Sequence, residues 1–418
     1  MSDSPEARNG QDRPADAPVR VGTRGSALAR TQTVTVAEQL GREAGLEHEL
    51  EVIRTEGDVT TGSLASLGGT GVFASALRAA VIDGRVDMAV HSLKDLPAAQ
   101  PEELEIVAVP LRADLRDALC ARDGLTLETL PEGARVGTGS PRRVAQLKAL
   151  RPDLELVDIR GNVQTRLARV PGLEPHDDHA PAAEGSPRGD LDAVVLACAG
   201  LDRLGLADVI TERIDTDVML PAPGQGALAV EVKAPEGDWI GEGFLADETV
   251  DVTTREGRLR AGLELVDDLH THVAVTAERA LLLRLEAGCA APIGAVARVE
   301  DGIVPGEDGA PDRTAPRIVL DAMVAALDGS RILRQSSSVQ LDPVPDDLVE
   351  DPAQAQEWIS DTLHMAAGAL GVHVAEAFVA EGADLLPGTV RGARQPADRV
   401  YEDGTPADVD ETGADTDA

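Results

Sequence analysis

A group of basic side chains stands out in an otherwise acidic chain. The 418 residues carry 74 acidic and 38 basic side chains, a formal net charge of −36. Residues 142–169 reverse this balance, with Arg142, Arg143, Lys148, Arg151, Arg160, Arg166 and Arg169 against Asp153, Glu155 and Asp158. Surface ion pairs are one explanation, and each would contribute little stability. Arg142 and Arg143 directly follow a predicted helix N-cap, however, so guanidinium and backbone N–H groups there can bind one anion. The expected ligand is a polyanion.

The segment HSLKDLP, residues 91–97, places a carboxylate just after a predicted strand. Asp95 is either a turn residue ahead of Pro97 or a carboxylate that transfers protons or stabilises a cation in a cleft. His91 is interpreted as a packed histidine of the core or sheet edge rather than as a catalyst.

A single cysteine lies among small residues in LEAGCAAPIG, residues 285–294. Cys289 either fills an apolar gap or carries a group attached to its sulfur, for which the small neighbours leave room. The other two cysteines, Cys120 and Cys198, lie far away in the sequence and show no metal-ligand spacing. This sparse, odd set argues against a disulfide framework, and we predict no metal site.

Two pairs of similar segments indicate how these residues are positioned. RVGTRGSALARTQ (20–32) and RVGTGSPRRVAQL (135–147) each read as a strand, a turn containing glycine, and a helix, with Ser26 and Ser140 as N-caps. VDMAVHSLKDL (86–96) and LDAVVLACAGL (191–201) each read as a buried strand that ends in a turn. The repetition predicts two related α/β lobes with mostly parallel sheets, and ligands bind at the carboxyl ends of such strands.

The remaining segments complete the predicted domain organisation. MLPAPGQGALAVEV (219–232) is interpreted as a crossing back to the first lobe, and the chain from about Val273 as a small α+β domain ending in a helix near 354–380. Three segments rich in proline, glycine and acids read as surface insertions: 176–190, 234–248 and 301–316. The predicted parts are a disordered tail (1–17), lobe 1 (18–115 and 222–272), lobe 2 (116–221), a C-terminal domain (273–388) and a disordered acidic tail (389–418).

The composition indicates a cytoplasmic protein adapted to salt. The N-terminus has no apolar core of a signal peptide, and no apolar run approaches the ~20 residues that span a bilayer. We therefore expect neither a membrane nor, given the acidity, a nucleic acid as partner, and we expect a monomer. Self-repulsion of the excess charge would be screened at molar salt, where the Debye length is roughly 3 Å, so a saline cytoplasm is the expected environment.

Six motifs in order resemble the hydroxymethylbilane synthase (porphobilinogen deaminase) family. They are TRGSALARTQ, VHSLKDLP, GTGSPRR, DIRGNVQTRL, LPAPGQGALAVE and AERALLLRLEAGCAAPIG, and the resemblance covers roughly residues 19–385. It implies two periplasmic-binding-protein-like (type II) lobes and a third domain. It also implies a transferase of tetrapyrrole and heme biosynthesis that joins four porphobilinogen molecules head to tail, with loss of ammonia, into linear hydroxymethylbilane.

The resemblance assigns roles to individual residues. Cys289 would hold a dipyrromethane cofactor through a thioether, and Asp95 would be the catalytic carboxylate. Residues that bind the acetate and propionate groups would be Arg24, Ser26, Lys94, Thr138, Ser140, Arg142, Arg143, Arg160 and Arg166. Two positions depart from the family pattern: Thr70 replaces a common lysine, and Gly139 replaces a common serine.

A competing interpretation is a non-catalytic two-lobed protein that binds an anionic metabolite. The lobes alone are compatible with it. It predicts a signal peptide or a DNA-binding helix-turn-helix, neither of which is seen, and it gives Cys289 no function.

Overall fold

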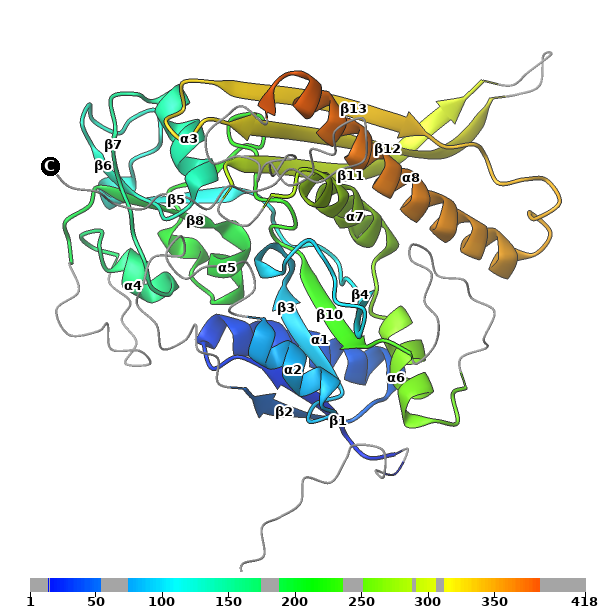
Figure 1. The fold of residues 1–418 in the computed structure, drawn as a ribbon. Coiled ribbons are helices and arrows are strands. Elements are labelled where there is room, and N and C mark those ends of the chain that lie inside the picture. Colours follow the sequence, from blue (N-terminus) through cyan, green and yellow to red (C-terminus); the bar gives the residue numbers. More distant parts are fainter. Residues whose placement is uncertain are drawn as a thin grey trace, which may run out of the picture.

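The computed structural model describes residues 14, 16–53, 74–173, 188–235, 251–287, 291–305 and 312–383. It contains three sheets, each covered by helices and each belonging to a separate unit of the chain (Figure 1). Outside the described residues lie Cys289, Thr70, almost all of the predicted N-terminal tail, the acidic tail, most of the predicted insertions 176–190 and 234–248, and residues 306–311 of the third. The expectations for these segments remain predictions. The prediction of a surface insertion over the whole of 301–316 is wrong at its two ends, because residues 301–304 and 313–316 pair as antiparallel strands.

The first sheet has the strand order β2-β1-β3-β10-β4 and is assembled from two separate parts of the chain. Its strands are β1 (Val19–Thr23), β2 (His48–Val52), β3 (Met88–Ser92), β4 (Leu104–Ala108) and β10 (Leu228–Lys233). β1 is parallel to β2 and β3, whereas β10 runs antiparallel between β3 and β4. Helices α1 (Ala27–Ala44) and α6 (Arg255–Glu264) pack on one face, and α2 (Ser75–Ile82) packs on the other.

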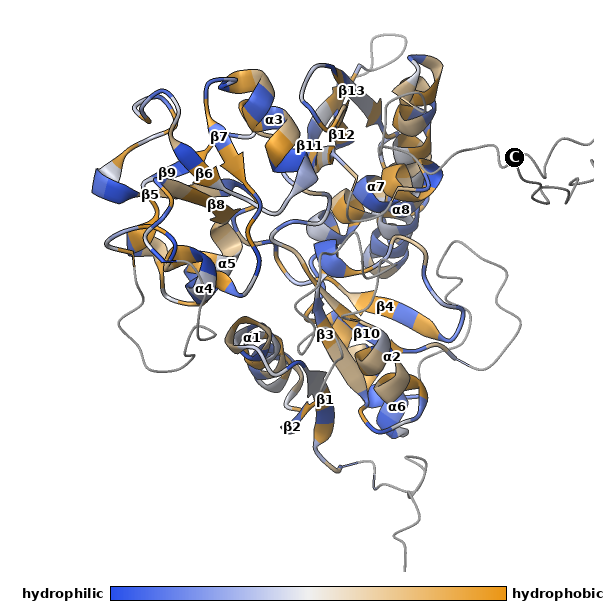
Figure 2. Cartoon of the chain, turned by 60° about the vertical axis from the view of Figure 1, so that its left-hand side comes forward, coloured by the Kyte–Doolittle hydropathy of each residue, from blue (hydrophilic) through white to orange (hydrophobic). Residues whose placement is uncertain are grey.

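The second sheet repeats this plan with the order β7-β6-β8-β5-β9. Its strands are β5 (Asp117–Ala121), β6 (Arg135–Gly137), β7 (Glu155–Val157), β8 (Ala193–Ala197) and β9 (Glu212–Ile214). β6 is parallel to β7 and β8, and β5 is the antiparallel strand. The covering helices are α3 (Pro141–Leu150), α4 (Val163–Leu167) and α5 (Cys198–Arg203). In Figure 2 the inner strands β3, β10 and β8 carry mostly hydrophobic colouring, in keeping with their buried apolar residues.

The repeated RVGT segments show why the two lobes share a local structure. A Cβ on Gly22, in β1, would come within 3.0 Å of Leu77 and 3.1 Å of Val86. A Cβ on Gly137, in β6, would come within 2.6 Å of Leu191 and 3.0 Å of Ile159. In both lobes glycine lets neighbouring side chains pack directly on the strand just before the turn to the helix.

The third unit is a three-stranded antiparallel sheet covered by two helices. It consists of α7 (Leu269–Arg284), β11 (Ile293–Val304), β12 (Arg313–Ala325), β13 (Ile332–Gln340) and α8 (Pro352–Ala380). Among the described residues, α8 is the helix that is long and apolar enough to cross a membrane. One side of it is buried in the domain core through Leu363, Leu370 and Phe378, which is what a core helix requires.

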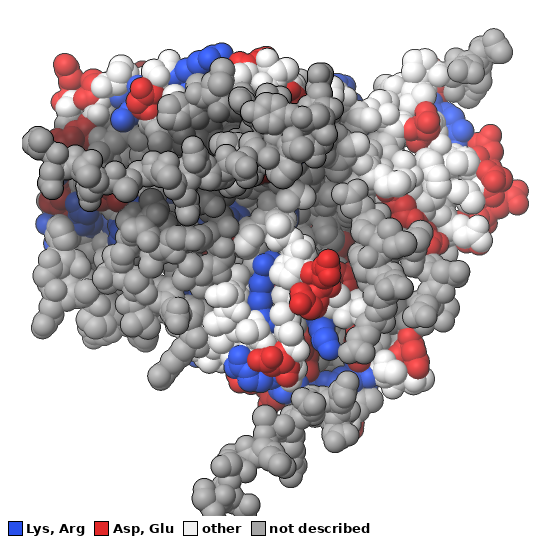
Figure 3. Space-filling model, viewed as in Figure 1, with Lys and Arg blue, Asp and Glu red and all other residues white. Residues whose placement is uncertain are grey.

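The structure confirms the predicted fold class, two α/β lobes of mostly parallel strands with a small α+β domain. Short 3₁₀ turns complete the described elements: Leu93–Asp95, Arg122–Gly124 and Ala207–Val209. Where Figure 3 shows described residues, acidic and basic side chains are interspersed.

Candidate active site

The predicted site residues of the first lobe lie at the carboxyl ends of two parallel strands. Arg24 and Ser26 follow β1, and Lys94 and Asp95 form the 3₁₀ turn that follows β3. Ser26 begins α1 as predicted, because its Oγ accepts a hydrogen bond from Ala29 N at 3.3 Å. The Asp95 side chain is exposed, and Lys94 is half-buried beside it.

The second lobe presents its predicted residues in the equivalent place. Thr138 and Ser140 follow β6, Arg160 follows β7, and Arg166 lies on α4. Ser140 occupies the N-cap position of α3, with Pro141 in the first turn, but its side chain makes no capping hydrogen bond. Thr138 is buried, and its hydroxyl accepts a hydrogen bond from Ser140 N at 3.3 Å.

Arg142 and Arg143 differ from the sequence expectation in where their guanidinium groups lie. Both are buried, and both contact Asp117 on β5. Arg142 Nη1 lies 2.8 Å from Asp117 Oδ2, and Arg143 donates from Nε and Nη2 to Asp117 Oδ1 at 3.0 and 2.7 Å. The bonds that were expected to go to an external anion therefore go largely to an internal carboxylate.

Electrostatic effects connect the two lobes. Burial lowers the pKa of Lys94 to about 8, against the opposing effect of Asp95. The charges of Arg142 and Arg143, in the second lobe, act in the same direction as burial. Burial likewise lowers the pKa of Arg166 to about 10, with Arg143 and Arg160 adding to the effect. Asp95 raises the pKa of Arg166. The contacts agree with this: one side chain, Gln225, bonds to Lys94 Nζ at 3.3 Å and to Asp117 Oδ1 at 2.8 Å, so residues of both lobes share one electrostatic environment.

This shared region carries more cations than carboxylates. Two arginines meet a single carboxylate at Asp117, and that carboxylate is fully buried. Arg142 Nε and Arg160 Nε are buried, and neither has a hydrogen-bond partner among the described residues. Such an excess of guanidinium donors is suited to carboxylates or phosphates brought by a ligand. No group of three or more His, Cys, Asp or Glu side chains in the described part of the chain is arranged to hold a metal ion.

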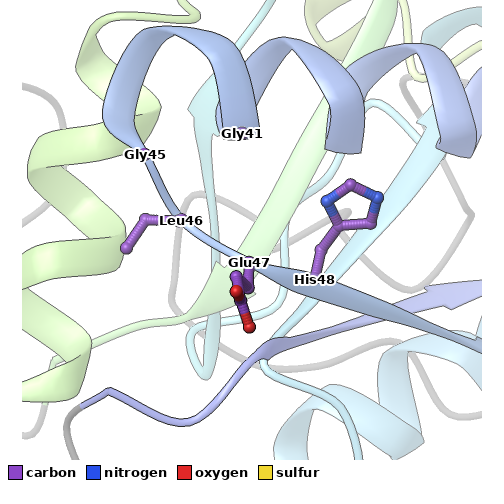
Figure 4. Close-up of a pocket in the computed structure, with 5 residues that line it drawn as sticks. All are labelled: Gly41, Gly45, Leu46, Glu47 and His48. Atoms are coloured by element: carbon purple, nitrogen blue, oxygen red, sulfur yellow. The ribbon is translucent and has the colours of Figure 1, made fainter.

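A pocket elsewhere in the first lobe does not belong to this region. It is lined by Gly41, Gly45, Leu46, Glu47 and His48, at the turn between α1 and β2 (Figure 4). Ser26 begins α1 and Gly45 ends it, so the 18-residue helix separates the two places by about 27 Å.

Comparison with known proteins gives two consecutive family matches. The model described as porphobilinogen deaminase, dipyromethane cofactor binding domain, matches residues 19–240, and the model for the porphobilinogen deaminase C-terminal domain matches residues 272–355. The chain belongs to the porphobilinogen deaminase family. The resemblance inferred from the six motifs is confirmed.

Similar proteins carry the same family name, and this chain aligns with most of their length. Porphobilinogen deaminase of Micrococcus luteus is 78% identical over 90% of this chain and 96% of its own. That of Cutibacterium acnes is 49% identical over 87% of this chain and 95% of its own. Among solved structures, an ABC transporter periplasmic substrate-binding protein from Coxiella burnetii aligns with 59% of this chain and 92% of its own, at 15% identity and a TM-score of 0.33.

The donor set fits the cofactor of the porphobilinogen deaminase family. Each pyrrole of a dipyrromethane carries an acetate and a propionate, and the region where the lobes meet offers guanidinium and ammonium donors in excess of carboxylates. Sequence reasoning missed three residues. Asp117 binds Arg142 and Arg143, and Gln225 contacts Asp117 and Lys94. Glu278 binds Arg112 and Gly224 N in the segments that join the lobes. The available signals were a glutamine between two glycines, in GQG, and a glutamate on the apolar face of α7.

Proposed function

We propose that this chain catalyses the head-to-tail condensation of four porphobilinogen molecules, with release of ammonia, to linear hydroxymethylbilane. The family assignment supports the reaction and the class of enzyme, a transferase. The observation that carries the site is the excess of cations where the carboxyl ends of the two sheets meet. Substrate and product both bear two carboxylates per ring, so the growing product is the polyanion that these cations suit.

In this proposal Asp95 is the catalytic carboxylate. Loss of ammonia and attack by the next ring both place positive charge on pyrrole nitrogens. A fixed carboxylate at the end of β3 stabilises that charge and accepts the proton that the attacking ring must lose. Lys94 beside it holds a substrate carboxylate.

The other proposed contacts are to acetate and propionate groups. Arg24, Ser26, Thr138, Ser140, Arg160 and Arg166 bind these groups directly. Arg142 and Arg143 are buried and contribute positive charge to the site without touching the ligand, since the single charge of Asp117 neutralises only one of the two.

The proposed anchor for the dipyrromethane cofactor is Cys289, through a thioether. When bound, the cofactor supplies the pyrrole to which the first substrate is joined. Cys289→Ser keeps the size of the side chain but replaces a thiolate by a poor nucleophile. The intact mass of the purified wild type should exceed the chain mass by one dipyrromethane, and that of the variant should not.

Cys198→Ser is the matched control, because Cys198 is a buried free thiol whose pKa is raised by burial. That variant should retain the adduct. An adduct on Cys289→Ser would remove the thioether proposal. An unmodified wild type without turnover would favour the non-catalytic binding protein.

We also propose a monomeric, cytoplasmic protein adapted to high salt, with the domain boundaries predicted from the sequence. The net charge of −36 supports the salt adaptation. Circular dichroism across a KCl series tests it: native structure should be lost on dialysis from molar salt to dilute buffer. An unchanged melting temperature in dilute buffer would contradict it.

A further inference from the structure

Gln225 occupies the point where the lobes are joined. It is buried, and it lies between Gly224 and Gly226, which have φ values of 73° and 87°. A Cβ on Gly224 would come within 3.2 Å of Lys94 N, and one on Gly226 within 2.6 Å of Ala113 O. The two glycines therefore let this segment lie directly against the turn that carries Lys94 and against the first connection between the lobes.

The side chain of Gln225 contacts both lobes. Its Nε2 donates to Asp117 Oδ1 at 2.8 Å and to Leu115 O at 2.9 Å. Its Oε1 accepts from Lys94 Nζ at 3.3 Å. An amide can connect a carboxylate to an ammonium group in this way because it has both a donor and an acceptor. A methionine of similar length would leave buried charged groups without these hydrogen bonds.

Asp117 extends this connection to the arginines. The oxygen that accepts from Gln225 also accepts from Arg143, and the other oxygen accepts from Arg142. One chain of contacts thus runs from the residue beside Asp95, through a single amide, to the first turn of α3.

We propose that Gln225 is a positioning residue that holds Lys94 at a fixed place relative to Asp117 and the two arginines of α3. The inference rests on the proposed site, in which Lys94 binds a substrate carboxylate beside Asp95. The charged groups that act on Lys94 are Asp95 on its own turn, Asp117 on β5, and Arg142 and Arg143 on α3. Gln225 adds a neutral acceptor to this set, so replacing it changes both the place of the ammonium and the pH at which it loses its proton.

The test compares the pH dependence of turnover in three variants. Gln225→Met removes the acceptor, so Lys94 loses its proton at lower pH and the alkaline fall in kcat/KM should move down in pH. At neutral pH, kcat/KM should fall roughly 10- to 100-fold, as for loss of a hydrogen bond to a charged group. Gln225→Glu places a carboxylate beside Lys94, so the alkaline fall should move up.

Gln146→Met is the matched control. Gln146 is a buried glutamine of α3 whose amide, among the described residues, bonds to the backbone of Leu220 at 2.9 and 3.0 Å. This variant should lose stability without moving the pH profile. Circular dichroism in high salt checks folding, and Gln225→Met alone suffices if the glutamate variant does not fold.

Two results overturn the inference: a wild-type pH profile in Gln225→Met, or the same displacement in Gln146→Met. Asp95→Asn, assayed alongside, separates the proposed catalytic role of Asp95 from the proposed positioning role of Gln225. Full activity of Asp95→Asn would refute the role of Asp95, whereas the Gln225 variants would still decide whether Lys94 is positioned by this amide.

Discussion

Glu278 and Arg112 form a buried two-point ion pair, with Arg112 Nη1 2.7 Å from Glu278 Oε1 and Nη2 3.0 Å from Oε2. Glu278 is fully buried on α7 and also accepts hydrogen bonds from Gly224 N at 2.6 Å and Ala297 N at 2.8 Å. One carboxylate therefore connects the third domain to both segments that join the lobes.

Glu278→Gln should destabilise the protein strongly. Removing one partner of a buried pair leaves the other charge uncompensated, at a cost of about 3–5 kcal/mol. Urea unfolding in high salt measures the free energy. Asp346→Asn is the control, since Asp346 is exposed and its pair with Arg313, at 3.1 Å, lies at the surface. Equal losses in the two variants would show that Glu278 has no special role.

The two lobes could be predicted because their signals are local. Repeated RVGT segments, the serine before each helix and the apolar strands are all readable within about 15 residues. Gly22 and Gly137 then occupy the same tightly packed position at the end of a strand. The strand order and the position of β10 in the first sheet depend on tertiary pairing, which the sequence does not show. The return of the chain to the first lobe was still predictable from the proline and glycine residues of the segment 219–232.

The partners of the arginines could not be predicted in the same way. Asp117 lies 25 residues before Arg142 on another element, and in the sequence it resembles any acidic residue beside an arginine. Only the folded sheet buries it under α3. Glu278 left a clearer signal, because a glutamate at helical spacing from Ala274 and Leu281 lies on the buried face of α7.

Asp117 should make part of the stability depend on pH. Burial alone would raise the pKa of Asp117, but Arg142 and Arg143 outweigh burial and hold it well below its usual range. A depressed folded pKa adds stability above the unfolded value, about 3.9, that is lost as the pH falls below it. The difference in unfolding free energy between wild type and Asp117→Asn should therefore be largest near pH 7 and shrink below about pH 4.

Urea unfolding at several pH values, at constant high salt, measures this difference. Asp251→Asn is the comparison, because Asp251 lies at the surface and contacts Thr253 rather than an arginine. A difference for Asp117→Asn that stays constant from pH 7 to pH 3 would mean that the carboxylate is not stabilised by the two arginines.

Gly139→Ser, which restores the serine that the family resemblance implies, should disturb the site. A Cβ on Gly139 would come within 2.6 Å of Ile159 O and 3.3 Å of Asp158 Oδ1. The backbone beside Arg160 must therefore move, at a cost of about 1–3 kcal/mol, and we expect a higher KM. Gly368→Ser, in α8, is the control because a Cβ there meets nothing within 4 Å. Unchanged stability and KM in Gly139→Ser would show that the loop adapts freely.

Asp95→Asn should abolish most turnover while substrate binding persists. The change keeps size and hydrogen bonding but removes the charge that the proposal places beside the pyrrole nitrogens. Asp95→Glu keeps the charge and displaces it by one methylene, so it should retain a measurable fraction of the activity. A positioned acid–base group typically accelerates a reaction about 10²- to 10⁴-fold. The turnover of Asp95→Asn should be lower than that of Asp95→Glu by a factor within this range.

Steady-state rates of both variants, with folding checked by circular dichroism in high salt, decide the matter. Asp158→Asn is the control, since Asp158 is an exposed carboxylate on the opposite lobe that contacts Arg160 at 3.3 Å. Asp158→Asn removes a negative charge from the same region but leaves the turn after β3 intact. The rate of Asp158→Asn should therefore lie well above that of Asp95→Asn. If Asp95→Asn is as active as Asp95→Glu, charge at this position is not required for catalysis, and Asp95 is a turn residue ahead of Pro97.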